Sequence, residues 1–268
     1  MSKKQRLLFC LCFFLLFLAG GCAMPAEKAE AALPQLVIGC DNHAPYNYAD
    51  SDGDPAGIDV ELALEACSRM GYEPVFVRID WSERDALLES GEIDCLWSCY
   101  SMDGQEDAYA WAGPYMRSRL VVAVLEDSPI QDLGDLTGQS VAVRVGSKAE
   151  RIFLGRTEKE VPQLRNVYTL NTMDEVVTAL RNDYVDAIAG YAAAVREVLE
   201  HDGIAYRFLS RDLSYASLGV AFAKHGDTTA QQALSQALEE MRADGTTAQI
   251  LQSYGVDTRK ALGGLSDG

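Results

Sequence analysis

The chain has 268 residues, of which 48% are hydrophobic, and a formal net charge of −17 at pH 7. This length supports one large domain or two medium ones, each with its own hydrophobic core. Because so acidic a surface repels phosphate groups, the composition excludes nucleic acid and anionic lipid as main partners.

Residues 1–21 have the pattern of a secretory signal peptide. Lys3, Lys4 and Arg6 form a positive start, and the apolar run "LLFCLCFFLLFLAG" follows them. This run is too short for a permanent membrane-spanning helix, and it ends in small residues, as cleaved signals do. We therefore expect the mature chain to be exported and to begin after residue 21.

The signal ends in "LAGGC", which resembles a bacterial lipobox. In a lipobox the cysteine, here Cys22, is joined to diacylglycerol and becomes the new N-terminus. An ordinary signal peptide followed by a chance cysteine is the alternative. Residues 22–34 are rich in Ala, Glu and Pro without apolar periodicity, as expected of a solvated tether. We expect an extracytoplasmic protein anchored to the cell membrane through lipidated Cys22.

Four cysteines remain after residue 22, and all four lie in apolar segments before residue 100. They are Cys40, Cys67, Cys95 and Cys99. Their spacing matches no zinc pattern, although Cys95 and Cys99 with His43 could be imagined as ligands. Buried thiols are the first interpretation, and a disulfide in an oxidising compartment is the second. The sequence predicts neither a metal site nor a cofactor.

From residue 36 onward, short apolar runs alternate with amphipathic helical stretches, which predicts an α/β fold. The predicted strands are "QLVIGC", "PVFVRI", "IDCLW", "LVVAVL", "SVAVRV", "DAIAG" and "LGVAFAK". Apolar residues at i, i+3 and i+4 predict helices over 58–70, 83–90, 147–154, 172–182, 190–200 and 228–243.

Several motifs then follow one another in a characteristic order. Asp41 ends a strand, Pro45 and Tyr46 form a turn, and "GIDVEL" starts a helix; "LLESGEIDCLW", "WAGPYM", "LRNDYVDAIAG" and "EEMRADGTTAQILQSYG" come later. This ordered set, over residues 36–256, resembles the bacterial extracellular solute-binding protein family 3, the receptors of polar amino acid ABC importers.

The resemblance implies a two-lobed fold of the periplasmic-binding-protein type II, with a ligand cleft between the lobes. Lobe 1 would hold residues 35–125 and 218–258, and lobe 2 would hold 126–217. The two crossings, "LVVAVLED" and "ASLGVAFAK", would act as the hinge. Residues 259–268 would form a flexible tail.

The charged residues of the family's usual clamp for an α-amino acid are not found at the matching positions of this chain. Family members hold the carboxylate with an Arg of lobe 1 and the amino group with an acid of lobe 2, because a zwitterion in a dry cleft needs both charges paired. Here the two positions read Gln105 and Tyr191. A shift of the register by one residue would place Glu106 or Asp107 in the cleft instead. The interpretation we favour is a family member with a different ligand.

Other positions keep the character of a binding site. His43 and Trp81 align with places where the family puts rings around the ligand, and core packing is the alternative role for each. Ser98 and Ser101 lie on a segment that usually offers hydroxyl and backbone groups to the ligand, unless they cap a loop. All four are predicted to contact the ligand.

A predicted anion site lies in "VGSKAE". Ser147 would cap a helix whose first turn presents free N–H groups, and Lys148 would add a positive charge. The alternative for Lys148 is a solvated surface lysine. If this site binds an anion while the acidic partner is missing, the ligand need not carry an ammonium group.

The sequence therefore predicts a monomeric, lipid-anchored receptor that captures an amino acid or a related small polar solute by lobe closure and feeds an ABC permease. An orphan sensor or scaffold without its own permease is the alternative. A dehydratase-like enzyme is not expected, because the chain has no nucleophile and base signature, no P-loop and no HExxH motif.

Overall fold

A computed structural model describes residues 32–155 and 161–265 of the chain. The predicted signal peptide, Cys22 and all of the tether before residue 32 lie outside the described residues. Every helix and strand below belongs to one compact unit that starts at Leu33.

The centre of the fold is a nine-stranded sheet with the order β4-β1-β5-β11-β6-β9-β7-β8, to which β10 adds by pairing with β6. Its strands are β1 (Gln35–Cys40), β4 (Glu73–Arg78), β5 (Cys95–Ser101), β6 (Ala110–Leu125), β7 (Ser140–Arg144), β8 (Asn166–Leu170), β9 (Ala187–Tyr191), β10 (Tyr206–Phe208) and β11 (Ser214–Phe222). A separate hairpin pairs β2 (Tyr48–Ala49) with β3 (Pro55–Ala56).

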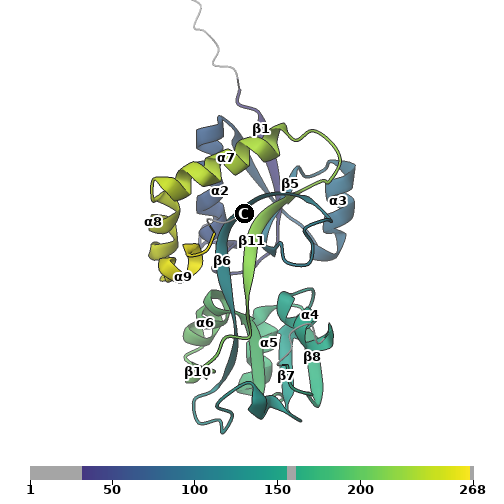
Figure 1. The fold of residues 1–268 in the computed structure, drawn as a ribbon, viewed down its shortest axis with the longest axis vertical. Helices are drawn as coiled ribbons and strands as arrows, with labels where there is room; N and C mark the ends of the chain where they lie inside the picture. The colour runs from purple at the N-terminus through teal and green to yellow at the C-terminus, as the bar shows by residue number, and fades with distance from the viewer. Residues whose placement is uncertain (1–31, 156–160, 266–268) are drawn as a thin grey trace, which may run out of the picture. The chain divides into compact units, whose positions relative to one another are not determined.

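The sheet has two halves joined by two long strands. In the first half β1 pairs in parallel with β4 and β5, and in the second half β7 pairs in parallel with β8 and β9. The strands β6 and β11 lie antiparallel to each other between the halves and run through both (Figure 1). The chain therefore passes between the halves along β6 and β11, where the two hinge crossings were predicted.

Helices cover both halves of the sheet. They are α2 (Ile58–Met70), α3 (Arg84–Ser90), α4 (Lys148–Gly155), α5 (Met173–Arg181), α6 (Ala192–His201), α7 (Thr229–Ala243), α8 (Thr246–Ser253) and α9 (Thr258–Leu262), with 3-10 turns η1 (Trp81–Glu83) and η2 (Gly134–Leu136). Figure 1 shows α2, α3, α7 and α8 around the first half and α4, α5 and α6 around the second.

Each half has a hydrophobic core of its own. Ile38, Leu62 and Trp97 belong to the largest buried cluster of the first half, whereas Val143 and Ile188 belong to clusters of the second. The parallel strands are apolar on both faces because helices pack on each side, so the strands read as continuous hydrophobic runs in the sequence. Burial of these separate cores holds each half together.

Local sequence signals explain where the helices begin and end. The helix α2 ends at Gly71, whose φ of +71° suits glycine and lets the Gly71 and Tyr72 N–H groups bond to the last carbonyls. The helix α5 begins with a capping box, in which Thr172 and Glu175 each bond to the other's backbone N–H.

The predicted flexible tail is wrong for residues 259–265. Asp257 caps α9 by accepting hydrogen bonds from the N–H groups of Arg259 and Lys260, and Ala261 and Leu265 are buried. The prediction failed because a helix of five residues is too short to show an apolar period, and it forms here by packing against the body of the fold.

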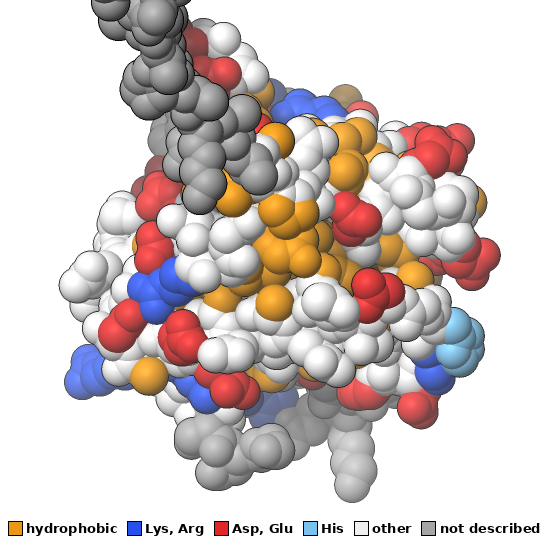
Figure 2. Space-filling model, turned by 90° about the horizontal axis from the view of Figure 1, so that it is seen from above, with side chains coloured by type: hydrophobic (Ala, Val, Ile, Leu, Met, Phe, Trp, Pro, Cys, Tyr) orange, Lys and Arg blue, Asp and Glu red, His pale blue; other side chains and the backbone are white. Residues whose placement is uncertain are grey.

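The surface seen in Figure 2 mixes acidic and basic side chains around a central group of hydrophobic ones. On that face the negative charge is therefore spread out rather than gathered in one patch. Within residues 32–155 and 161–265, none of the helices combines the length and hydropathy that crossing a bilayer requires.

Candidate functional site

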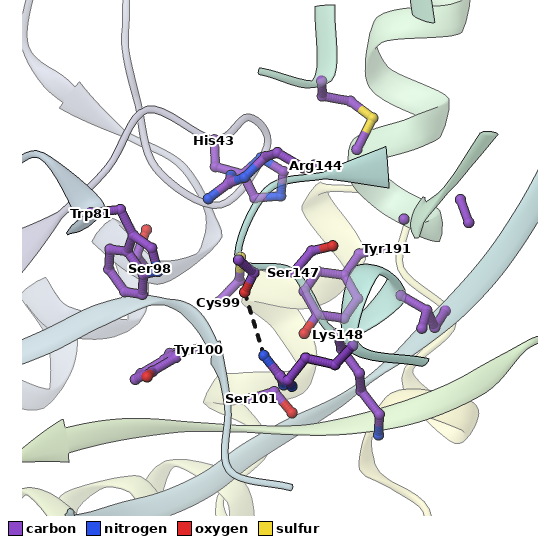
Figure 3. Close-up of a pocket in the computed structure, with 16 residues that line it drawn as sticks. His43, Trp81, Ser98, Cys99, Tyr100, Ser101, Arg144, Ser147, Lys148 and Tyr191 are labelled. Atoms are coloured by element: carbon purple, nitrogen blue, oxygen red, sulfur yellow. Dashed lines mark hydrogen bonds between the residues drawn. The ribbon is translucent and has the colours of Figure 1, made fainter. Parts of the chain in front are cut away.

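A pocket that is partly open to solvent lies between the two halves of the sheet. Its walls come from both halves (Figure 3). The lining residues are His43, Trp81, Ser98, Cys99, Tyr100, Ser101, Leu120, Arg144, Gly146, Ser147, Lys148, Arg151, Met173, Ala189, Gly190 and Tyr191.

The pocket brings together every predicted ligand residue except Gln105. The predicted residues that line it are His43, Trp81, Ser98, Ser101, Ser147, Lys148 and Tyr191. Contact of each with a ligand remains a prediction, but segments more than 140 residues apart in sequence converge on one cavity.

Gln105 does not line the pocket, and its side chain bonds to two residues at the end of β5. Its side-chain N–H donates to the Ser101 carbonyl at 3.0 Å, and its side-chain oxygen accepts from the Tyr100 hydroxyl at 2.8 Å. Glu106 and Asp107, which a shifted register would place in the cleft, are exposed and do not line the pocket either. The resemblance predicts that residue 105 binds the ligand. In the structure its side chain instead joins the loop after β5 to β5 through hydrogen bonds.

A buried carboxylate holds the β5 backbone that forms the wall of the first half. Cys99 has a φ of +41°, which is uncommon for a residue with a side chain, and its N–H donates to Asp59 at 2.6 Å. Asp59 also accepts from Tyr115 at 2.9 Å and from Asn47 at 3.1 Å. Burial raises the pKa of Asp59 to about 7, although these hydrogen bonds lower it. Asp59 therefore positions Ser98–Ser101 from behind the pocket.

Aromatic rings form much of the same wall. The rings of Trp81 and Tyr100 meet at right angles with centroids 5.0 Å apart, and the Arg84 guanidinium lies 5.5 Å from the Trp81 ring. Edge contacts of this kind fix ring orientation and stabilise the pair beyond simple burial. In Figure 3, Trp81 and Tyr100 lie on one side of the pocket and Tyr191 lies on the other.

The wall of the second half is built on the start of α4. Gly146 has a φ of +71°, which turns the chain out of β7, and the Ser147 hydroxyl then accepts from the Glu150 N–H at 3.2 Å. The predicted cap is thus present. Lys148 donates to Asp103 at 2.6 Å, and its side chain is only 12% exposed. The interpretation of Lys148 as a solvated surface lysine is wrong, because the first turn of α4 faces the other half of the sheet.

A second ion pair also joins the two halves. Arg144, at the end of β7, donates to Asp41, which follows β1, and the Ser98 hydroxyl donates to the same carboxylate. Burial raises the pKa of Asp41, but the Arg144 charge and the hydrogen bonds from Ser98 and Arg144 together lower the net pKa. Sequence reasoning missed Arg144. Its signal was a single cation in the otherwise apolar run "SVAVRV".

His43 is neutral in this setting. Burial, together with the Arg144 charge, lowers the pKa of His43 to about 3, although Asp41 opposes the shift. Figure 3 shows His43 beside Arg144. A neutral imidazole offers one donor and one acceptor but no charge, so His43 serves as a polar ring in the wall.

Sequence reasoning also missed Arg151, Met173 and Gly190 as lining residues. Arg151 lies in the second turn of α4, where the sequence alone does not show which face meets the pocket. Met173 begins α5 and Gly190 lies in β9, and a carbon atom added at Gly190 would approach the Met173 methyl group to 2.8 Å. These positions become neighbours only through the fold.

The four cysteines are free and buried. Burial raises the pKa of Cys40 and of Cys67 to about 11, so both are inert thiols at neutral pH. The structure has thiols rather than the alternative disulfide. Among the described residues no group of three or more His, Cys, Asp or Glu side chains is arranged to hold a metal ion.

Comparison with known proteins agrees with the fold. The family model of the bacterial extracellular solute-binding proteins, family 3, matches residues 36–257. The chain belongs to this family. The lysine/arginine/ornithine-binding periplasmic protein of Escherichia coli (strain K12) is 31% identical over 250 residues, which cover 85% of this chain and 91% of that protein.

Further family members agree. The histidine-binding periplasmic protein of Salmonella typhimurium is 28% identical over 246 residues, covering 85% of this chain and 91% of that protein. The crystal structure of an ABC uptake transporter substrate-binding protein from Streptococcus pneumoniae with bound histidine superposes with a TM-score of 0.73 at 26% identity. That match covers 82% of this chain and 92% of the other.

These matches confirm the predicted fold and family. The chain is an α/β solute-binding protein of the periplasmic-binding-protein type II, and a binding protein rather than an enzyme. The names of the relatives describe proteins that work in the periplasm. These names do not specify which ligand this chain binds, so the ligand has to be inferred from the residues of its own pocket.

Proposed function

We propose that this family member is the extracytoplasmic receptor of an ABC importer and captures an amino acid or a related small polar solute. The observation that carries the proposal is the pocket, which takes its walls from both halves of the sheet. A site of that kind opens and closes when one half moves relative to the other. Relatives named as binding amino acids in the periplasm support this ligand class.

Closure would occur by bending of β6 and β11. In this proposal residues 35–119 and 218–258 move as one lobe and residues 120–217 move as the other, because residues 120–125, expected in lobe 1, pair with β9 and β10 and belong to the cores of the second half. The ion pairs Asp41–Arg144 and Asp103–Lys148 each join one residue of the first lobe to one residue of the second, so they favour a closed arrangement. A ligand that added contacts to both walls would shift the equilibrium further toward closure.

Anchoring completes the proposed role. Lipidation of Cys22 would tie the receptor to the membrane that holds the permease, with residues 22–34 as the tether. Growth with radiolabelled palmitate should label the wild-type protein, and Cys22→Ser should abolish the label and release the protein from membranes. Labelling of the Cys22→Ser variant would contradict lipidation at this residue, without bearing on solute binding.

Thermal-shift screening tests solute binding directly. The chain from Leu33, which contains every described helix, strand and core cluster, is heated with amino acids and small polar metabolites, one at a time. A true ligand at about 100 times its Kd should raise the Tm by roughly 5 °C or more. If no amino acid or small polar metabolite raises the Tm, the proposed function fails.

A matched pair of variants locates the binding. Tyr191 lines the pocket, whereas Tyr184 is 74% exposed elsewhere on the second half. Tyr191→Ala should remove most of the ligand-induced rise in Tm, and Tyr184→Ala should keep it. Because each rise is measured against the same variant without ligand, lower stability of Tyr191→Ala does not confuse the result.

A further inference from the structure

We infer that the captured solute is a small monoanionic carboxylate with a planar, largely apolar body and no ammonium group. The inference rests on the proposed function, because it names the ligand class of the same pocket. It separates this chain from relatives whose names specify the zwitterions lysine, arginine, ornithine and histidine.

The charges on the pocket wall have one sign. Arg144, Lys148 and Arg151 line the cavity, and within the described residues no Asp or Glu side chain does. A cation that enters a partly dry cavity needs a carboxylate or several oxygen acceptors around it. The wall therefore favours an anion and disfavours an ammonium group.

The two aspartates next to the wall are already satisfied by the protein, and the Glu150 carboxylate accepts from the N–H of Gly146, a lining residue, at 2.6 Å. Asp41 accepts from Arg144 and from the Ser98 hydroxyl. Asp103 accepts from Lys148 at 2.6 Å and from the Ser217 N–H at 3.2 Å. An ammonium group could reach either carboxylate only by displacing a protein cation, which would then be left unpaired in a partly buried site.

Arg151 is the third cation on the pocket wall, besides Arg144 and Lys148. Among the described residues it forms no ion pair, and its guanidinium reaches only the Gly146 carbonyl, at 3.4 Å. Arg144 and Lys148 are each paired with an aspartate, whereas Arg151 is in no ion pair among the described residues; the Glu150 carboxylate lies at the same helix start and accepts from the Gly146 N–H at 2.6 Å. The first turn of α4 adds the positive end of a helix dipole on the same side. A carboxylate suits both features, since a guanidinium binds it through two parallel hydrogen bonds.

The position where the resemblance predicts an acid for a ligand ammonium is neutral in this chain. Tyr191 occupies it, and burial raises the pKa of the Tyr191 phenol above its ordinary value, so the ring stays uncharged. Its ring packs edge-on against Tyr46 with centroids 6.2 Å apart. Tyr191 can donate a hydrogen bond to an anion, but it cannot compensate a positive charge.

The body of the ligand follows from the rings. Trp81 and Tyr100 from the first half and Tyr191 from the second half line the cavity, with neutral His43 at its edge. Aromatic walls favour flat apolar groups, which bury area and stack at little entropic cost. A small aromatic or unsaturated carboxylate therefore fits better than a highly hydroxylated or dianionic solute.

Three sets of ligands test the inference. Within each set the ring is the same, and the three compounds are a carboxylate, an amino acid and an amine. The phenyl set is 3-phenylpropionate, L-phenylalanine and 2-phenylethylamine, and equivalent sets carry indole and imidazole rings. Isothermal titration against the chain from Leu33 should show one or more propionates binding at least about tenfold tighter than the matching amino acid, with no binding of the amines.

Two results overturn the inference. One is an amino acid that binds as tightly as its propionate, or more tightly, in every set that binds. The other is the absence of binding by all three propionates. If amino acids bind at least as tightly as the propionates in every set that binds, or if amino acids bind while no propionate does, the proposed function stands while the anion inference fails. If neither the sets nor the screen produces a ligand, the proposed function fails as well.

A matched pair of arginine variants tests which charge binds the anion. Arg151→Gln should weaken binding of the tightest propionate by about tenfold or more, as expected for loss of a hydrogen bond between charged groups. Arg181→Gln removes the same charge from an exposed pair with Asp202 on the same half, and should change the affinity less than about twofold. Equal losses in the two variants, or no loss in Arg151→Gln, would overturn the assignment.

Discussion

The two walls of the pocket differ in charge and in chemistry. The first-half wall presents aromatic rings and serines, with Asp41 and Asp103 beside it, whereas the second-half wall presents Arg144, Lys148 and Arg151. Two cations of the second wall pair with the two aspartates of the first. The comparison teaches that opposite charges hold the walls together and that the surplus charge is positive.

The pocket also differs from the rest of the molecule. The whole chain carries a formal charge of −17, yet the described wall of the pocket carries only positive charges. Net charge governs solubility and the approach of partners, whereas recognition depends on the few groups within contact distance of the ligand. An acidic protein can therefore hold an anion.

The largest effect is expected when the charge balance between the walls is broken. Arg144→Met leaves Asp41 without its cation in a site where the two side chains are 16% and 15% exposed, so the free energy of unfolding in urea should fall by about 2 kcal/mol. Arg181→Met breaks an exposed pair and should cost less than about 1 kcal/mol. Equal losses would mean that the pair between the walls has no special weight.

The support behind the first wall should show a distinctive pH dependence. The pKa of Asp59 is raised from 3.8 to about 7 in the folded chain, so the folded state holds this proton more tightly than the unfolded state. Its stabilising contribution is present at low pH and is lost as pH rises through about 7. Between about pH 5 and pH 7, the wild type should lose about 2 kcal/mol of stability relative to Asp59→Asn.

Urea unfolding of both proteins across this pH range measures the difference. A constant difference between wild type and Asp59→Asn would show that Asp59 is ionised throughout, held by its three hydrogen bonds. In that case Asp59 would still position the first wall, but as a carboxylate.

His43 should give the opposite trend. The pKa of His43 is lowered to about 3 in the folded chain, whereas in the unfolded chain it is about 6.5. As pH falls below about 6.5, the unfolded chain therefore binds a proton at His43 and the folded chain does not. The wild type should lose about 2 kcal/mol of stability relative to His43→Gln as pH falls from about 7 to about 5. The same unfolding series measures this change. A difference that does not vary with pH would mean that His43 is not held neutral beside Arg144.

The smallest effect is expected at Gln105. Gln105→Ala removes bonds to Tyr100 and to the Ser101 carbonyl in a half-buried loop, and should lower the free energy of unfolding by about 0.5 kcal/mol. Because Gln105 does not line the pocket, affinity for the tightest solute in titration should change less than about twofold. A tenfold loss of affinity in Gln105→Ala would show that Gln105 takes part in ligand binding.

The fold could be predicted well where a segment carries its own pattern. The helix predicted over 58–70 is observed as α2 with the same bounds, because its apolar stripe and terminal glycine are local signals. The strand predicted over 120–125 is only the end of β6, which begins at Ala110. The missed part contains a glycine, a proline and two arginines, and it becomes a strand by pairing with β11.

The site could be predicted only in part, for a similar reason. His43, Trp81 and Tyr191 were located through ordered motifs, and all three line the pocket. The pairing of Arg144 with Asp41 joins residues 103 positions apart, and no local pattern connects them. Counting positions along a loop placed Gln105 in the cleft, but the direction of its side chain depends on hydrogen bonds that only the folded loop provides.

A crystal structure of the chain with its tightest-binding solute tests the central claim most directly. The account predicts a ligand carboxylate against Arg151 and the first turn of α4, with the planar body between Trp81 and Tyr191 and the pairs Asp41–Arg144 and Asp103–Lys148 intact. A ligand ammonium bound to Asp41 or Asp103, with Arg144 or Lys148 displaced, would contradict it.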